Sequence, residues 1–244
     1  MSIQSYWSKI SENYDEISYW NKGDREMHTF YLEALLKKPG FNPSSFLELG
    51  CGTGFFTASF FKLYPEIFGV MIDGSPEMLK IAKEKLGLDS SRSIFICRLL
   101  EAIDPSTDLK RSFDVVFSAL TIHHLDNEDK IKIFKLAYQT LNTKGAFILF
   151  DIFKTYYKPS DELLEYLACR YIQAQLKKRL DIDFELEELT IQNIIINDRN
   201  SKLEEGDHEM SIHDHLQALE QIGYGPITVF YQESNFFGLV AYKR

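Results

Sequence analysis

Short apolar runs alternate with longer stretches of mixed character between residues 44 and 150, and this alternation predicts the fold class. The mixed stretches carry helical periodicity, clearest at residues 76–86, where apolar positions 78, 79, 81, 82 and 86 form one face between lysines. Strands alternating with helices predict a parallel sheet with helices on both faces. Five strands are expected at residues 45–49, 67–72, 94–97, 113–117 and 146–150, and helices at 53–63, 76–86 and 130–141.

The alternation stops after Asp151 and resumes near Ser211. Residues 159–209 have a helical pattern with polar interruptions and are expected to form an inserted lid. Ser211 can cap the start of a helix that runs to about Ile222, and Gly223 suits its end. The chain is predicted to be one domain: a cap (1–39), a cofactor-binding core (40–151), the lid (159–209), and a carboxyl-terminal helix with a closing hairpin at 226–232 and 236–243 (210–244).

Charge is distributed unevenly along the 244 residues. The chain has 27 Lys and Arg against 36 Asp and Glu, a net charge of −9. This balance disfavours direct nucleic-acid binding and attachment to anionic membranes. Residues 159–209 alone hold 13 acidic and 6 basic residues, so the remainder is nearly neutral. An acidic lid favours a neutral or cationic small molecule as substrate.

Cysteine and histidine spacing predicts neither disulfides nor a metal site. The three cysteines, Cys51, Cys97 and Cys169, form no CxxC pair. His213 and His215 are two apart on a predicted helix and point to different sides, so they and the nearby His208-Glu209 are not expected to bind metal. The run Lys177-Lys178-Arg179 is expected to be a solvated helix face. The amino terminus lacks a signal-peptide pattern and no apolar run reaches about 18 residues, so a cytoplasmic protein that does not span a membrane is expected.

A glycine-rich turn carries the candidate chemistry. The strand at 45–49 leads into Gly50-Cys51-Gly52-Thr53-Gly54 and then a helix, which lets backbone N–H groups approach a ligand closely. Glu48 precedes the turn, and Asp73 closes the next strand, where a carboxylate can accept both hydroxyls of a ribose. The same layout binds dinucleotides, so the pattern predicts a nucleotide-type ligand without naming it.

The third glycine distinguishes the possible cofactors. Phe55 stands where the dinucleotide fingerprint G-x-G-x-x-G has its last glycine. The motif ELGCGTG at 48–54, the later Asp73 and the phrase FDVVFSALTIHHL at 113–125 resemble class I S-adenosylmethionine-dependent methyltransferases. The resemblance covers about residues 1–150 and 210–244. It implies an α/β, Rossmann-like methyltransferase fold with a seven-stranded, mostly parallel sheet whose last strand is antiparallel.

The resemblance also implies which residues contact S-adenosylmethionine. The glycines would line its methionine and ribose portions, Glu48 would orient the amino group, and Asp73 would bind the ribose. Leu99 stands where the family often has an acidic residue, so either Glu101 replaces that residue or adenine is held by apolar contacts and backbone. The implied cofactor contacts are Glu48, Gly50, Cys51, Gly52, Gly54, Asp73, Gly74, Met78, Leu100, Glu101, Ser118 and Ala119. Tyr14 is a candidate lid residue over the cofactor, with Tyr19 and Trp20 as further candidates.

Three residues are candidates for catalysis: His123, His124 and Asp151. A histidine can act as a general base because its pKa lies near working pH. Alternatively, one histidine packs beneath the sheet, or transfer proceeds through proximity and alignment alone. Asp151 ends the fifth strand and either orients a substrate or caps the chain that follows.

The predicted function is methyl transfer from S-adenosylmethionine to a small-molecule acceptor, with release of S-adenosylhomocysteine. Residues 1–39 and 159–209 can roof the site and exclude bulky polymers. Three alternatives stay open: an enzyme that makes a modified S-adenosylmethionine or acts in tRNA modification, a non-catalytic S-adenosylmethionine-binding regulatory protein, and a nicotinamide-dependent dehydrogenase. The acceptor atom and the oligomeric state do not follow from the sequence.

Overall fold

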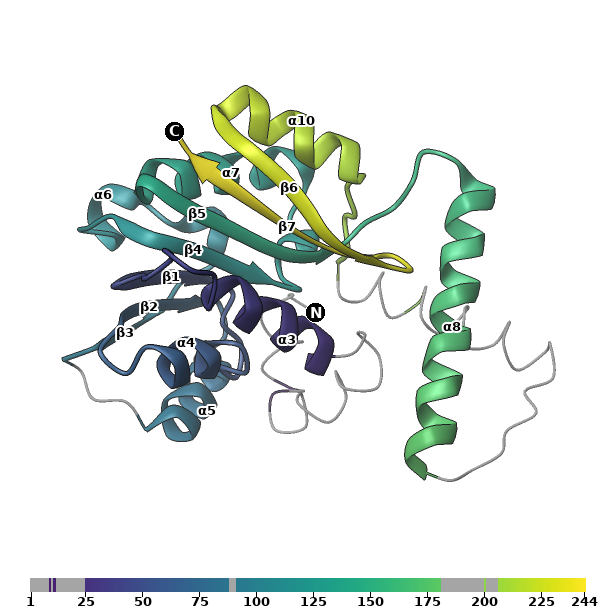
Figure 1. Ribbon diagram of the computed structural model, residues 1–244, viewed down its shortest axis with the longest axis horizontal. Helices are drawn as coiled ribbons and strands as arrows, with labels where there is room; N and C mark the ends of the chain where they lie inside the picture. The colour runs from purple at the N-terminus through teal and green to yellow at the C-terminus, as the bar shows by residue number, and fades with distance from the viewer. Residues whose placement is uncertain (1–8, 10, 12–24, 88–90, 181–199, 201–205) are drawn as a thin grey trace.

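The computed structural model describes residues 9, 11, 25–87, 91–180, 200 and 206–244, and its centre is one seven-stranded sheet (Figure 1). The strand order is β3-β2-β1-β4-β5-β7-β6. Neighbours among β1 to β5 pair in parallel, whereas β7 runs antiparallel to both β5 and β6. The predicted sheet with an antiparallel last strand is therefore confirmed. The strands are β1 (Ser45–Leu49), β2 (Phe68–Asp73), β3 (Ser93–Cys97), β4 (Phe113–Ala119), β5 (Leu141–Ile152), β6 (Tyr224–Glu233) and β7 (Phe236–Lys243).

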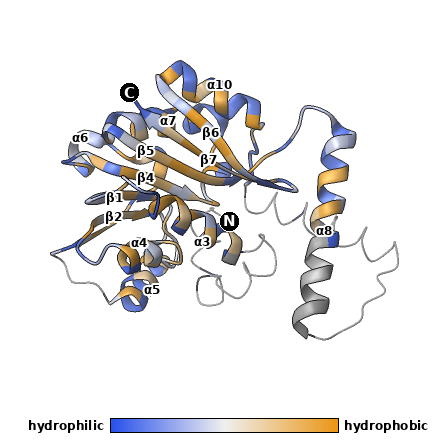
Figure 2. Cartoon of the chain, in the orientation of Figure 1, coloured by the Kyte–Doolittle hydropathy of each residue, from blue (hydrophilic) through white to orange (hydrophobic). Residues whose placement is uncertain are grey.

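Helices cover both faces of the sheet, as the alternating pattern predicts. Alternate strand residues point to opposite faces, so each face has its own apolar core. One face packs against α3 (Arg25–Leu36), α4 (Thr57–Leu63) and α5 (Pro76–Leu86), and the other against α7 (Asn127–Thr140) and α10 (Ile212–Ile222). The strands are mostly apolar, whereas α5 and α10 each have an apolar and a polar side (Figure 2). Short turns follow the strands at α6 (Pro105–Asp108), η2 (Leu100–Ala102) and η3 (Ile122–His124).

Two predicted boundaries are wrong by four or five residues, both for reasons of local backbone. The helix expected from residue 53 begins at Thr57, because the glycine turn needs left-handed backbone at Gly52 and Gly54, with φ of +51° and +76°. The strand expected from residue 146 begins at Leu141, which pairs with Phe113 across a β-bulge. A bulge adds length to a strand without changing its apolar pattern, so hydrophobic periodicity did not reveal it.

Helix α10 confirms the prediction made from its capping residues. The Ser211 hydroxyl accepts a hydrogen bond from the Asp214 N–H at 3.1 Å. Gly223 ends the helix with φ +116°, a left-handed conformation that suits glycine. The predicted hairpin follows as β6 and β7.

The segment predicted to form a lid begins with α8 (Lys158–Leu180), which stands beside the β6–β7 hairpin (Figure 1). The first half of α8 contacts this hairpin, because the Ser234 hydroxyl between β6 and β7 donates to the Leu164 carbonyl at 2.8 Å. Residues 181–199 and 201–205 lie outside the described residues, as do the side chains of Lys177, Lys178 and Arg179. No helix among the residues described is long and apolar enough to cross a membrane.

Candidate functional site

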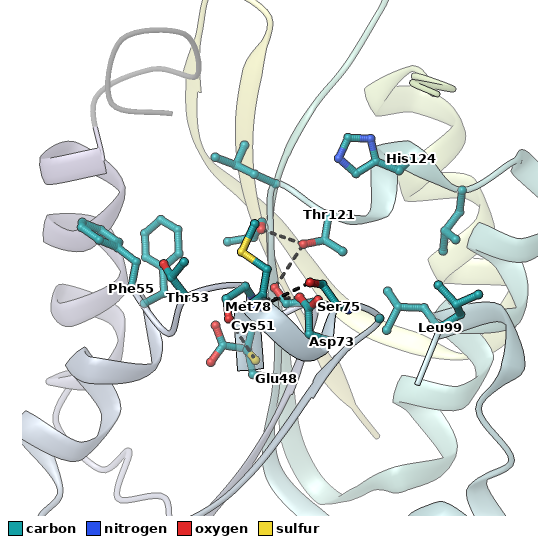
Figure 3. Close-up of a pocket in the computed structure, with 18 of the residues that line it drawn as sticks. Glu48, Cys51, Thr53, Phe55, Asp73, Ser75, Met78, Leu99, Thr121 and His124 are labelled. Atoms are coloured by element: carbon teal, nitrogen blue, oxygen red, sulfur yellow. Dashed lines mark hydrogen bonds between the residues drawn. The ribbon is translucent and has the colours of Figure 1, made fainter. Parts of the chain in front are cut away.

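A cavity of about 360 Å³ opens at the carboxyl ends of β1, β2 and β4. This is the edge of an open α/β sheet where ligands bind. Figure 3 shows Asp73, Ser75 and Met78 at its centre, with Phe55 and Leu99 on opposite sides. The predicted site residues that line it are Glu48, Gly50, Cys51, Gly52, Asp73, Gly74, Met78, Leu100, Glu101, Ala119 and His124.

The glycine turn brings two loops into close contact at the cavity floor. Gly50 has φ +76°, and a Cβ placed on it would lie 2.1 Å from Cγ2 of Thr121. The Thr121 hydroxyl donates to the Gly50 carbonyl at 3.2 Å. Gly54 is needed for a different contact, because a Cβ placed on it would lie 2.9 Å from Cδ1 of Leu86 on α5. Gly50 thus allows the loop after β4 to approach, whereas Gly54 allows helix packing and does not line the cavity.

Asp73 presents a carboxylate at the end of β2. Its Oδ2 accepts from the Gly52 N–H and its Oδ1 from the Ser75 N–H, each at 2.8 Å. Burial raises the pKa of Asp73, and these two hydrogen bonds lower it. These two backbone N–H groups therefore fix the Asp73 carboxylate in the cavity wall. There it could accept hydrogen bonds from two neighbouring hydroxyl groups of a bound ligand.

Glu48 lies deeper and is 2% exposed. The Thr57 hydroxyl donates to its Oε2. Burial raises the pKa of Glu48 to about 8, the Thr57 hydrogen bond lowers it and the nearby Asp73 charge raises it. The carboxyl group therefore keeps its proton at neutral pH and would ionise beside a cation. Burial also raises the pKa of the Cys51 thiol well above its ordinary value, so this group is not a reactive thiolate.

Apolar side chains form the wall beyond Asp73. Met78 and Leu99 line it, and a Cβ on Gly74 would lie 2.7 Å from Cδ2 of Leu99. Glu101 lines the same region from η2. The acidic side chain of Glu101 and the apolar side chains of Met78 and Leu99 therefore share this wall.

Sequence reasoning missed Arg25, which is 3% exposed and lines the cavity from the start of α3. Its guanidinium carbon lies 4.6 Å from the centre of the Phe55 ring, a cation–π distance. No motif marks Arg25, because tertiary packing alone brings α3 to the glycine turn. The cavity thus has a buried cation on the side opposite Leu99.

The two adjacent histidines have different environments. His124 lines the cavity, whereas His123 is 1% exposed and does not. Nδ1 of His123 contacts Oδ1 of Asp151, which is also 1% exposed and outside the cavity lining. Burial raises the pKa of Asp151 to about 6, and the neighbouring His215, the Ile152 N–H, His124 and Lys130 lower it. Of the three catalytic candidates, only His124 is in the cavity wall.

Asp207 joins the two histidines, although no sequence pattern pointed to it. Its Oδ1 lies 2.7 Å from Nδ1 of His124 and 3.7 Å from Nε2 of His123. These three ligand-type atoms lie within 4.8 Å of one another. The site therefore contains two carboxylates and two imidazoles close together, supplied by three separate parts of the chain.

The remaining candidate residues either lie away from the cavity wall or fall outside the described residues. Ser118 does not line the cavity; its hydroxyl donates to the Leu49 carbonyl at 2.8 Å and ties β4 to β1. His213 is exposed and His215 is buried, so they point to different sides of α10 as expected. Nδ1 of His215 forms a hydrogen bond with the Ser211 carbonyl at 2.8 Å. Tyr14, Tyr19 and Trp20 lie outside the described residues.

Comparison with known proteins gives consistent matches. A family profile described as "Methyltransferase domain" matches residues 46–145. Malonyl-acyl-carrier-protein O-methyltransferase 1 of Ilyobacter polytropus is 33% identical over 228 residues, 91% of this chain and 76% of that protein. Malonyl-acyl-carrier-protein O-methyltransferase of Anoxybacillus flavithermus is 28% identical over 177 residues, 72% of this chain but only 62% of that protein. N-methyltransferase NodS of Bradyrhizobium japonicum, solved with S-adenosyl-L-homocysteine, shares the fold with a TM-score of 0.64 at 14% identity, covering 100% of this chain and 99% of that chain.

Proposed function

This chain belongs to the class I S-adenosylmethionine-dependent methyltransferases, and we propose that it methylates an oxygen atom of a small-molecule acceptor. The two curated relatives described above carry the name O-methyltransferase, which supports oxygen as the acceptor atom. The observation that carries the proposal is the cavity itself, which has the Asp73 carboxylate at its centre, where it could hold a ribose, and His124 in its wall. An acyl group presented on a carrier protein, as the relatives' names describe, is the second candidate acceptor.

The residues present fit S-adenosylmethionine. Asp73 would accept the ribose hydroxyls, and the raised pKa of Glu48 marks a carboxyl group that would ionise beside the cofactor's ammonium. Arg25 would offer its charge to the cofactor's carboxylate, and Met78 and Leu99 would border adenine. The cofactor supplies an electrophilic methyl group on a sulfonium when bound.

The protein's own residues would align the acceptor, exclude water from the reacting atoms and accept the proton that the acceptor loses. Apolar and aromatic side chains, among them Phe55, Phe56 and Leu125, line much of the cavity, so they would exclude water from the reacting atoms. An acceptor held between these residues and His124 would be aligned for transfer. His124 would take the proton that a hydroxyl acceptor loses.

Cofactor binding is tested first, by calorimetry with S-adenosylmethionine and S-adenosylhomocysteine. Asp73→Asn removes a charge that would hold two hydroxyls, so we expect affinity to fall about 10- to 100-fold, as for loss of charge-assisted hydrogen bonds. Glu66→Gln, at an exposed carboxyl outside the cavity, is the matched control and should bind like the wild type. Equal affinity of Asp73→Asn and wild type would show that the ribose is bound elsewhere.

Transfer is tested by measuring release of S-adenosylhomocysteine with hydroxylated small molecules, free carboxylic acids and malonyl-acyl carrier protein as acceptors. Mass analysis of the products identifies the methylated atom. Turnover with a small hydroxylated or carboxylic acceptor supports the proposal, whereas turnover with the carrier protein alone supports the second candidate. Cofactor binding without turnover would favour a regulatory protein, and a modified cofactor in the purified protein would favour the tRNA-related alternative.

A further inference from the structure

Residues 206–210 precede α10 and lie against the η3 turn, which holds both adjacent histidines. The His208 N–H donates to the His123 carbonyl at 2.7 Å. The Lys130 ammonium, on a residue that is 0% exposed, donates to the carbonyls of His208 and Leu125. These contacts hold residues 206–210 beside the histidine turn, although the two segments are far apart in the sequence.

Three side chains with metal-binding atoms converge where these two segments meet. His123, His124 and Asp207 each offer one ligand atom, and these atoms lie within 4.8 Å of one another. Oδ1 of Asp207 is 2.7 Å from Nδ1 of His124 and 3.7 Å from Nε2 of His123. All three of these atoms are buried. The fold therefore gathers two imidazole nitrogens and a carboxylate oxygen in one small volume.

The geometry points to a binding site for one divalent transition-metal ion, of which zinc is the type, held by His123, His124 and Asp207. Two imidazoles and a carboxylate form a known zinc ligand set, and a water molecule would complete a tetrahedral ion. Two ligands of such an ion stand about 3.3 Å apart, given zinc–ligand bonds of about 2.0–2.1 Å. The observed separations of 2.7 Å and 3.7 Å fall on either side of that value, so small side-chain shifts would complete the site.

Asp151 supports this site from behind His123. Its Oδ1 forms a hydrogen bond with Nδ1 of His123, so the carboxylate lies at the ring nitrogen opposite the one that faces Asp207. A histidine that binds a metal through one ring nitrogen almost always bonds a carboxylate, carbonyl or water through the other, which orients the ring. Asp151 is itself held by the Ile152 N–H, which donates to its Oδ1 at 3.0 Å. The outer partner that a metal-binding histidine requires is therefore present.

The charges around these atoms also favour a cation. The side chains of Asp151 and Asp207 are 0% and 4% exposed, and buried charges in proteins are paired or bind metals. Lys130 is a nearby cation that interacts with both carboxylates, but its ammonium donates to backbone carbonyls. The two carboxylates outnumber this ammonium, so a divalent ion would reduce the buried negative charge.

The proposed ion site lies directly behind the cavity wall. His124 is 12% exposed and lines the cavity (Figure 3), whereas His123 and Asp207 do not line it. Rotation of the His124 side chain would therefore open a path for the ion from the cavity. An ion on Nδ1 leaves the proton of the neutral ring on Nε2, so His124 could no longer take a proton from an acceptor. This consequence rests on the proposed function: the ion would slow transfer to a hydroxyl acceptor.

Zinc binding is tested first, by calorimetry on the full-length protein after a chelator has removed bound metal, with zinc chloride alone as the probe. We expect one ion per chain in the wild type and loss of this binding in His124→Gln and in Asp207→Asn. Asp151→Asn keeps all three ligands and should weaken binding about 10- to 100-fold. His213→Gln, at an exposed histidine on α10, is the matched control and should bind like the wild type. Equal zinc affinity of wild type, His124→Gln and Asp207→Asn would overturn the proposal.

Cobalt absorption provides a readout on the wild type that does not depend on any variant. Co²⁺ in a four-coordinate tetrahedral site absorbs visible light far more strongly than Co²⁺ in water. The metal-free wild type should gain this absorption with one equivalent of cobalt and lose it when zinc is added. Circular dichroism should show that His124→Gln and Asp207→Asn are folded, and neither should gain the absorption. Absence of the tetrahedral spectrum in the wild type would overturn the site.

Turnover distinguishes failure of the ion site from failure of the proposed function. With a hydroxylated acceptor that the wild type methylates, one equivalent of zinc should slow release of S-adenosylhomocysteine about 100-fold or more, as for loss of a general base. A chelator should restore the rate, and Asp207→Asn should not respond to zinc. Zinc bound at one equivalent with unchanged turnover would refute the base role of His124 and leave the ion site standing. Methyl transfer by a protein that binds no zinc would refute the ion site alone.

Discussion

Replacing Glu48 with glutamine should stabilise the protein at neutral pH while weakening its affinity for the cofactor. Burial raises the pKa of this carboxyl group from an ordinary value of 4.5 to about 8. The folded state therefore prefers the protonated group, whereas the unfolded chain loses the proton above pH 4.5. Glutamine is always neutral, and its amide oxygen can still accept the hydrogen bond from the Thr57 hydroxyl.

The size and direction of the effect follow from proton linkage. Because the folded pKa is raised, the stability that the protonated group provides is fully present below pH 4.5 and is lost as pH rises to about 8. Each pKa unit corresponds to about 1.36 kcal/mol, so the cost of Glu48 approaches about 5 kcal/mol above pH 8 and about 3 kcal/mol at pH 7. Glu48→Gln should avoid this loss.

The assay is urea denaturation of wild type and Glu48→Gln at pH 4.5, 6 and 8, with Glu66→Gln as an exposed control. The difference in unfolding free energy between Glu48→Gln and wild type should grow by several kcal/mol across this range. Calorimetry at pH 7 should show weaker binding of S-adenosylmethionine to Glu48→Gln, because the partner for the ammonium is lost. A stability difference that does not change with pH would refute the reasoning.

Two further substitutions test the turn and the cap that shape the site. Gly50→Ala should lower the free energy of unfolding by about 2–5 kcal/mol, because it combines left-handed strain with a clash against Thr121. Gly40→Ala is the control, since Gly40 has φ +81° with nothing within 4 Å of a Cβ, and it should cost only about 1–2 kcal/mol in urea denaturation. Equal costs would show that the Thr121 contact is unimportant. Ser211→Ala should cost about 1 kcal/mol in the same assay, because the Asp214 N–H loses its acceptor, and an unchanged unfolding free energy would contradict the capping role.

The sequence by itself determined the elements whose signals are local. Five strands, the apolar face of α5 and the cap at Ser211 follow from side-chain periodicity and from hydrogen bonds between residues only a few positions apart. The glycine turn could also be predicted from the sequence, because the left-handed backbone at Gly50, Gly52 and Gly54 favours glycine whatever surrounds it. Asp73 followed from the same logic, as the residue that ends the next parallel strand beside that turn.

Only the tertiary structure decided which polar groups meet. His123 and His124 are adjacent and chemically identical, yet one is buried against Asp151 and the other lines the cavity. Arg25 lines the cavity and Asp207 contacts His124 although neither lies in a motif, because packing of α3 and of residues 206–210 brings them there. Periodicity reports which side of its own element a residue occupies. Contacts between distant segments depend instead on how those elements pack, which no local pattern encodes.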